Sequence, residues 1–302
     1  MNGILTVGYD GSTPSRRAVA WAAMEADRRR AKLQIVACYS ITPLAYPWVG
    51  SAAFPADIDL LEKAARDGLH EVAAEVTLSF PTLSVEQRAV FGWARDELVE
   101  AARDSDLLVV GTTGVGAAES VLFGSVAHAV ARASCCPVAL VPDGPDRPPF
   151  NRIMVGVDGS KASQLAADWA TDEADRLSVE CVECVECVVV HAWSYPYATE
   201  LSSETGHDLT HVDAELCLEA AVERCRERGR CPVRGELVEL SATKALVEAS
   251  AQADLVVVGS RGRGELRSLL FGSVAHTVAQ HAACPVVVIR AARSGEVSVG
   301  HE

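Results

Sequence analysis

The chain has 302 residues, of which 49% are hydrophobic and 23% charged, and its formal net charge is −14. This length and apolar content suit about two globular domains and exclude a disordered chain. The negative charge argues against binding to nucleic acid or to an anionic membrane surface, and no run of about 18 apolar residues is present to span a bilayer. The start of the chain lacks the basic and apolar segments of a signal peptide, so we expect a cytoplasmic location.

Apolar runs alternate with helical patterns through the first half of the chain. The expected strands are Ile4–Val7, Leu33–Cys38, Val85–Phe91, Asp106–Val110 and Val138–Val141. The expected helices run from Thr13 to about Ala31, from Asp57 to about Thr77, from Arg95 to Arg103 and from Ser125 to Ala133. Thr13 is the expected N-cap residue of the first helix, with Pro14 at its first helical position.

The same order returns in the second half after a segment rich in proline and aspartate. The expected strands are Ile153–Val157, Cys187–Ala192, Val233–Leu240, Asp254–Val258 and Val286–Ile289. The expected helices are Ala162–Leu177, His207–Arg228, the segment from a Ser241 cap to Ala251, and Ser273–Ala282. We therefore predict a domain over 1–143, a linker over 144–150, a second domain over 151–292 and a polar tail over 293–302.

Strands that alternate with helices and are apolar throughout indicate a parallel sheet covered on both faces. The prediction is an α/β fold of two tandem repeats, each a five-stranded, mostly parallel open sheet with helices on both faces. Ligands of such sheets bind beyond the carboxyl ends of the strands. Asp10, Gly111, Asp158 and Gly259 fall at such ends, so each repeat should gather one site there.

Two glycine loops follow the fourth strand of each repeat and share the pattern G-x2-G-x9-G-S. The first loop contains Gly111, Gly114 and Gly124-Ser125, and the second contains Gly259, Gly262 and Gly272-Ser273. Glycines allow the backbone to approach a ligand closely, and a helix that begins at Gly-Ser presents unpaired N–H groups to an anion. A phosphate is the anion that this pattern favours. The glycines could instead serve tight turns alone, and Asp10 and Asp158 could be simple turn formers.

The motifs together resemble the universal stress protein family, in its tandem, ATP-binding form. The resemblance covers nearly the whole chain and rests on three motifs that each occur twice: Val7–Ser12 and Val155–Ser160, the two glycine loops, and the Cys-Pro-Val endings at Cys136 and Cys284. It implies a Rossmann-like fold of the adenine-nucleotide α-hydrolase type and one ATP per repeat. It also implies that the last strands of the two repeats pair edge to edge, and it leaves open whether two chains form a homodimer.

The resemblance further implies which residues bind the nucleotide. In the first repeat these are Gly8, Asp10, Ala37, Cys38, Gly111, Thr112, Gly114, Gly116, Gly124, Ser125 and Val126. In the second they are Gly156, Asp158, His191, Ala192, Gly259, Ser260, Arg261, Gly262, Gly264, Gly272, Ser273 and Val274. The two aspartates would lie beside the adenosine or a bound Mg²⁺, and the second strands would meet the adenine through backbone groups.

The two loops differ in charge. The second carries Arg261 and Arg263, whereas the first carries Thr112-Thr113 and Val115 at the corresponding places. We therefore expect the first repeat to bind nucleotide more weakly than the second.

No nucleophile, base and orienting group are recognisable together, and no lysine lies in either loop. The preferred function is therefore an ATP-binding stress protein whose occupancy changes its conformation or its binding of an unidentified protein partner. The alternatives are a slow ATPase or phosphotransferase, and an interaction module that does not respond to nucleotide.

Two further residue patterns are not assigned to the site. His128 and His276, which recur after the loops, are expected to be solvated. Cys181, Cys184 and Cys187 are attributed to a local triplet duplication and not to a metal site.

Overall fold

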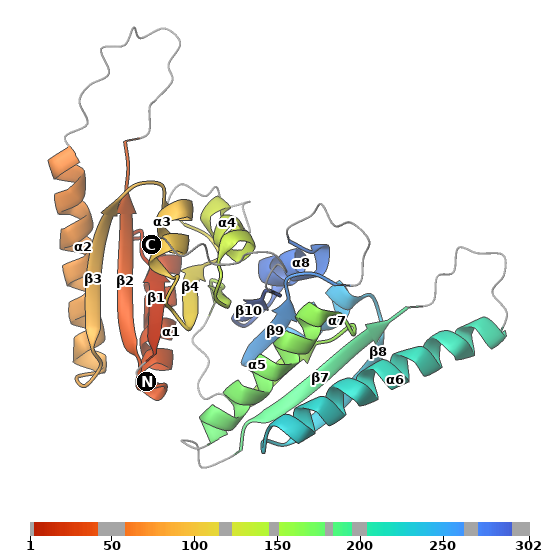
Figure 1. The fold of residues 1–302 in the computed structure, drawn as a ribbon. Coiled ribbons are helices and arrows are strands. Elements are labelled where there is room, and N and C mark those ends of the chain that lie inside the picture. Colours follow the sequence, from red (N-terminus) through yellow and green to blue (C-terminus); the bar gives the residue numbers. More distant parts are fainter. Residues whose placement is uncertain are drawn as a thin grey trace, which may run out of the picture.

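The structure, a computed structural model, describes residues 3–41, 58–114, 123–144, 151–178, 184–194, 204–262 and 271–291. Its strands form one sheet in the order β3-β2-β1-β4-β5-β10-β9-β6-β7-β8 (Figure 1). The strands of the first repeat are β1 (Ile4–Gly8), β2 (Lys32–Tyr39), β3 (Val85–Phe91), β4 (Leu107–Gly111) and β5 (Val138–Val141). Those of the second are β6 (Arg152–Gly156), β7 (Glu186–Trp193), β8 (Val233–Glu239), β9 (Leu255–Gly259) and β10 (Val286–Ile289).

Helices cover both faces of this sheet. Those of the first repeat are α1 (Thr13–Arg28), α2 (Ile58–Ser79), α3 (Ala94–Ala101) and α4 (Ser125–Ala133). Those of the second are α5 (Lys161–Ser178), α6 (Glu204–Arg228), α7 (Ala242–Ser250) and α8 (Ser273–His281). This is the predicted α/β architecture. Of the helices in the described ranges, none combines the length and apolar character that crossing a bilayer requires.

Successive strand residues point to opposite faces of the sheet, and this alternation divides the core into two clusters. Leu107 and Val109 of β4 pack in the cluster under α1, α2, α5 and α6. Leu108 and Val110 pack in the cluster under α3, α4, α7 and α8. Because both faces of the central strands are buried, these strands are apolar throughout.

The ends of α1 differ from the sequence-based prediction. Ser12, and not Thr13, is the N-cap residue: its backbone is extended, and its Oγ accepts a hydrogen bond of 3.2 Å from the N–H of Ser15. The prediction chose the second of two adjacent hydroxyl residues, and either type can cap a helix. The helix ends at Arg28 and not at Ala31, because Arg30 has a φ of 49°, in the left-handed region that helices do not continue through.

The two repeats are joined within the sheet. All strand pairs inside each repeat are parallel, whereas β5 and β10 pair antiparallel, with Ala139 opposite Val287. The strands of the two repeats therefore run in opposite directions, and their carboxyl ends point to opposite sides of the molecule. We call the region where β5 pairs with β10 the joint between the repeats. Side chains pack across it on both faces of the sheet.

On one face, α1 and α5 bury a cluster of charged groups between the repeats. The side chains of Glu25 and Glu173 are each 2% exposed, and Arg29 lies between them, with its Nη2 2.8 Å from Glu173 Oε2. Arg176 pairs with Glu173 as well. Burial raises the pKa of Glu173 to about 8, with Glu25 adding to the rise. Burial opposes ionisation of Glu25 too, yet Arg29 and the hydrogen bond from Glu173 lower its pKa, so the titrations of the two carboxyl groups are linked.

On the other face, α4 and α8 bring four rings together between the repeats. Phe123 and Phe271 stack with their planes 4° apart, and His128 and His276 lie edge-on to each other with centroids 5.5 Å apart. Each phenyl ring also meets both imidazoles edge-on. Burial lowers the pKa of His128, and the neighbouring His276 and Arg132 lower it further. Both histidines are half-buried and not fully solvated as predicted, because the rings meet across the joint, which a single helical pattern does not show.

Candidate functional site

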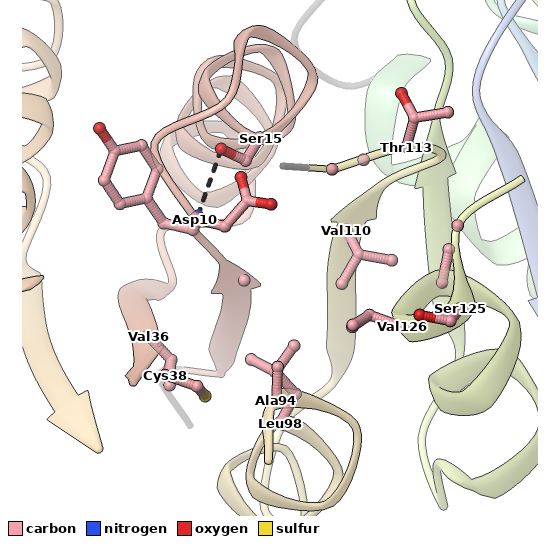
Figure 2. Close-up of a pocket in the computed structure, with 16 residues that line it drawn as sticks. Asp10, Ser15, Val36, Cys38, Ala94, Leu98, Val110, Thr113, Ser125 and Val126 are labelled. Carbon is pink, nitrogen blue, oxygen red and sulfur yellow. Dashed lines mark hydrogen bonds between the residues drawn. The ribbon is translucent and has the colours of Figure 1, made fainter. Parts of the chain in front are cut away.

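The first repeat contains a cavity of about 390 Å³ at the carboxyl ends of β1, β2 and β4 (Figure 2). It opens on the face of the sheet that α3 and α4 cover, and Ser15 in the first turn of α1 forms part of its wall. The predicted residues that line it are Gly8, Asp10, Cys38, Gly111, Gly114, Gly124, Ser125 and Val126. Strand ends, the glycine loop and the start of α4 therefore meet in one place.

Asp10 is held by a tight turn at the entrance to α1. Its Oδ1 accepts hydrogen bonds from the N–H of Ser12 at 3.0 Å and from the Oγ of Ser12 at 2.5 Å. Its own N–H donates to Ser15 Oγ at 3.3 Å, which is the dashed line in Figure 2. Gly11, with a φ of 83°, allows this turn. The turn orients Oδ2 toward the glycine loop, where a β-carbon on Gly114 would lie 2.6 Å from it.

The glycines of the loop have different structural roles. A β-carbon on Gly111 would lie 2.9 Å from the carbonyl oxygen of Pro14, so β4 needs glycine there to pack against α1. Gly114 leaves room for the Asp10 carboxylate. Gly124 closes the loop by donating to the carbonyl of Thr112 at 2.6 Å, and it is also the N-cap residue of α4.

The start of α4 points its first turn into the cavity. Gly124 has no side chain to cap the helix, and Ser125, Val126 and Ala127 all line the wall. The first N–H groups of a helix lack intrahelical partners, and they carry the positive end of the helix dipole. The combination of these donors with glycines suits an anion such as a phosphate.

Strand alternation decides which residues of β2 face the cavity. Val36 and Cys38 line it, whereas Ala37, which was also predicted, is buried in the opposite cluster. Burial, and then the nearby Glu97, raise the pKa of Cys38 to about 11, so a neutral thiol faces the cavity. In the loop, Thr112 is 5% exposed and donates from its N–H to Val141 at 3.0 Å, while its neighbour Thr113 lines the cavity. Gly116, the remaining predicted residue of this repeat, lies outside the described residues.

The second repeat reproduces the aspartate turn. Asp158 Oδ1 accepts a hydrogen bond of 3.0 Å from the N–H of Ser160, and Asp158 N–H donates to Ser163 Oγ at 3.3 Å. Gly159 has a φ of 77°. A β-carbon on Gly262 would collide with Asp158 Oδ2, as at the corresponding place in the first repeat.

The rest of the second loop follows the same plan. Gly156 packs against Leu246, and Gly259 packs against the backbone of α5 at Ala162. Ser260 is 3% exposed and anchors the loop by donating to Ile289 at 2.7 Å. Gly272 is the N-cap residue of α8, whose first residues are Ser273 and Val274. Arg261 occupies the position of Thr113, and the predicted Gly264 lies outside the described residues.

On β7, the strand alternation again separates two predicted residues. The ring of His191 lies on the α5 face, where Nδ1 is 2.7 Å from the carbonyl oxygen of Val157. Ala192, one residue on, points to the face that carries α7 and α8. Only Ala192 of the two directs its side chain toward the side of the sheet where the first repeat has its cavity.

The sequence analysis missed much of the cavity wall. The missed residues are Tyr9, Ser15, Val36, Ala94, Leu98, Val110, Thr113 and Ala127. Most are apolar, and because apolar residues usually lie in the core, nothing in the sequence marked them as residues of a binding site. Val36 had a usable signal, because it lies two positions before Cys38 on the same strand and so shares its face. Leu98 had none, since only the fold places α3 beside β1.

In the described part of the chain, no three His, Cys, Asp or Glu side chains are grouped to hold a metal ion by themselves. A metal at this site would need oxygens from a ligand in addition to a carboxylate such as that of Asp10. Carboxylate together with phosphate oxygens is the arrangement in which Mg²⁺ is usually bound.

Comparison with known proteins places this architecture in a family. The profile of the Universal stress protein family matches residues 1–142 and again residues 149–290. The chain belongs to the universal stress protein family. The universal stress protein Rv2005c of Mycobacterium tuberculosis is 34% identical over 299 residues, which cover 95% of this chain and 96% of that protein. Universal stress protein Rv2623 of the same organism is 34% identical over 295 residues, with the same coverage.

The fold of the whole tandem chain also has a solved counterpart. A universal stress protein from Archaeoglobus fulgidus aligns over 96% of this chain and 97% of its own, with a TM-score of 0.66 and 19% sequence identity. The two universal stress protein repeats are therefore arranged in a fold that is already known.

Proposed function

We propose that this universal stress protein binds ATP with Mg²⁺, one nucleotide in each repeat, and that occupancy changes its conformation or its binding to a protein partner. The observation that carries the proposal is the convergence of Asp10, the glycine loop and the first turn of α4 on one cavity. The apolar walls at Val36, Leu98 and Val110 suit the adenosine, and the α4 end suits the phosphates. The same turn and loop geometry around Asp158 supports a second site.

Nucleotide released from the purified protein tests this proposal. We expect protein prepared without added nucleotide and then denatured to release ATP, or to bind it on titration with Mg²⁺, at up to two per chain. Asp10→Ala and Asp158→Ala should each remove one site. Absence of both release and binding would show that the loops serve turn chemistry alone, and ATP turnover that is lost in Asp10→Ala or Asp158→Ala would favour the slow ATPase.

The loop arginine should make the two sites unequal. We expect Arg261→Thr to weaken ATP binding at the second site about tenfold, or ~1.4 kcal/mol, because a charge-assisted contact to phosphate is removed. Thr113→Arg should strengthen the first site by a similar factor, since Thr113 faces the cavity. Calorimetric titration would measure each change, with the other site silenced by its aspartate-to-alanine substitution.

Thr113→Ala is the control for this pair, because it changes the wall without adding charge. It should leave the affinity of the first site within about twofold, or ~0.4 kcal/mol, of its starting value. If Thr113→Arg behaves like Thr113→Ala, the loop cation does not set the difference between the repeats. The glycines themselves are less suitable for this test, because alanine at Gly111 or Gly259 would strike helix backbone and disturb the fold.

A further inference from the structure

A second hollow adjoins the first cavity and is larger, at about 790 Å³. The two share Cys38, Ala94, Ser125 and Val126, so one continues into the other. We call the second hollow the α4 groove, because one face of α4, from Ser125 to Ala133, forms a wall along the whole helix.

The α4 groove concentrates positive charge in a chain with a net charge of −14. Arg95 from α3, Arg132 from α4 and Arg290, directly after β10, all line it, and no acidic residue is among the described residues of its wall. Outside the wall, Asp96 Oδ2 lies 3.4 Å from Arg95 Nε, and Glu97 is close enough to raise the pKa of Cys38. Arg290 comes from the other repeat and donates from Nη1 to the carbonyl oxygen of Ser134 at 2.7 Å, which holds it at the far end of α4.

The groove also exposes an aromatic surface. Trp93 lines it and is 51% exposed, and the guanidinium of Arg95 lies 5.8 Å from the centre of its ring. Nucleobases stack on exposed aromatic rings of this kind.

The residues at the equivalent positions of the other repeat are different. At the equivalent positions the second repeat has Ser241 for Trp93, Thr243 for Arg95 and Gln280 for Arg132, and Pro142 of the first repeat is the equivalent of Arg290. The first repeat thus lacks the cation of the second loop but carries cations farther along α4. The repeats differ in where they offer positive charge, and not only in how much.

The distance along α4 limits what could use these cations. Arg132 is seven residues after Ser125, which is roughly 10 Å at the rise of an α-helix. The groove therefore continues beyond the first turn of α4, where the phosphates of a nucleotide in the cavity would lie. A ligand that fills both the cavity and the groove would place further anionic groups along the groove, beside its arginines.

We propose that the first repeat binds a dinucleoside polyphosphate, with one adenosine in the cavity, the phosphate chain along the α4 groove and the second base on Trp93. The inference rests on the proposed function, because it needs the cavity to accept an adenosine. It assigns Arg95, Arg132 and Arg290 to the phosphate chain. It also gives the first repeat a ligand preference that differs from that of the second.

Titration with diadenosine tetraphosphate and with ATP tests the assignment in a chain whose second site is silenced by Asp158→Ala. We expect the first site to bind the dinucleotide at least tenfold more tightly than ATP. Arg132→Gln and Trp93→Ser introduce the residues found at the equivalent positions of the second repeat. Each should reduce that preference severalfold, while the affinity for ATP stays within about twofold of its value in the parent chain. Thermal unfolding of each variant would show that the fold is kept.

The outcomes separate the two proposals. ATP binding with no preference for the dinucleotide would overturn the assignment of the groove and leave the proposed function intact. A preference that survives in the Arg132→Gln/Trp93→Ser double variant would overturn the assignment as well, because the groove residues would not be its source. If neither ligand binds to the first site, the proposed function fails at that site and the inference fails with it.

Discussion

Replacing Arg29 with leucine is expected to destabilise the protein by about 3–5 kcal/mol, because the substitution leaves two buried carboxyl groups without their shared cation. The side chain of Arg29 is 8% exposed and lies between Glu25 of its own helix and Glu173 of the other repeat. Leucine is the residue at the equivalent position of the second repeat, Leu177, so the helix itself tolerates it. Urea unfolding followed by circular dichroism would measure the loss.

The dependence of that loss on pH identifies its cause. In Arg29→Leu, burial without the shared cation would disfavour ionisation of both carboxyl groups. Their folded pKa values would therefore lie above the unfolded value of 4.5. A raised folded pKa contributes stability that is fully present below the unfolded pKa and is lost as the pH rises. The gap between the parent protein and Arg29→Leu should therefore widen from pH 4.5 to pH 8.

Arg66→Ala is the matched control, since Arg66 pairs with Glu62 on one helix, and its side chain is 61% exposed. An exposed pair of this kind contributes about 0–1 kcal/mol, so this variant should remain close to the parent protein at every pH. A loss in Arg29→Leu that is small, or that does not change with pH, would contradict the account of the cluster as a buried charge network.

Phe271→Ala should destabilise the protein by a comparable amount, about 3–5 kcal/mol, because it removes a buried ring from the joint between the repeats. Phe271 is 7% exposed and contacts Phe123 and both histidines of the four-ring cluster. Phe123→Ala should cost less, since that ring is only half-buried. Equilibrium unfolding of both variants would give the two values.

The double variant tests whether the rings act as one unit. If they do, the loss in Phe123→Ala/Phe271→Ala will fall short of the sum of the single losses by about 0.5–3 kcal/mol, as contacting residues usually do. Strict additivity would mean that the rings contribute independently to their own repeats. Because each phenylalanine directly precedes the Gly-Ser that begins α4 or α8, the variants should also be titrated with ATP.

Much of the fold could be predicted from the sequence, because the signals that define it are local and occur twice. Apolar runs that end in Asp-Gly-Ser or in a glycine loop located the strand ends, and the structure gathers Asp10, Gly114 and Ser125 there as expected. Errors within the site came from choosing between neighbours. Thr112 and Thr113 are chemically identical, and only the fold shows which of them is buried.

The features that sequence analysis missed are those that depend on the contact between repeats. Arg29 reaches Glu173, and Arg290 enters a groove of the opposite repeat, across gaps that no local pattern encodes. His128 and His276 look like surface residues of two separate helices until β5 and β10 are paired. Periodicity describes one element at a time, and these contacts arise only when two elements from different halves meet.

The antiparallel pairing of β5 with β10 has an evolutionary consequence. A dimer of two identical chains joined in this way would place the same residue at both equivalent positions, so any change for one site would alter the other. Because the two halves are encoded in one chain, that constraint is absent, and each half can diverge while its partner is always present. Thr113 against Arg261, and Arg132 against Gln280, are differences that duplication and fusion permit and that a symmetric ancestor could not have carried.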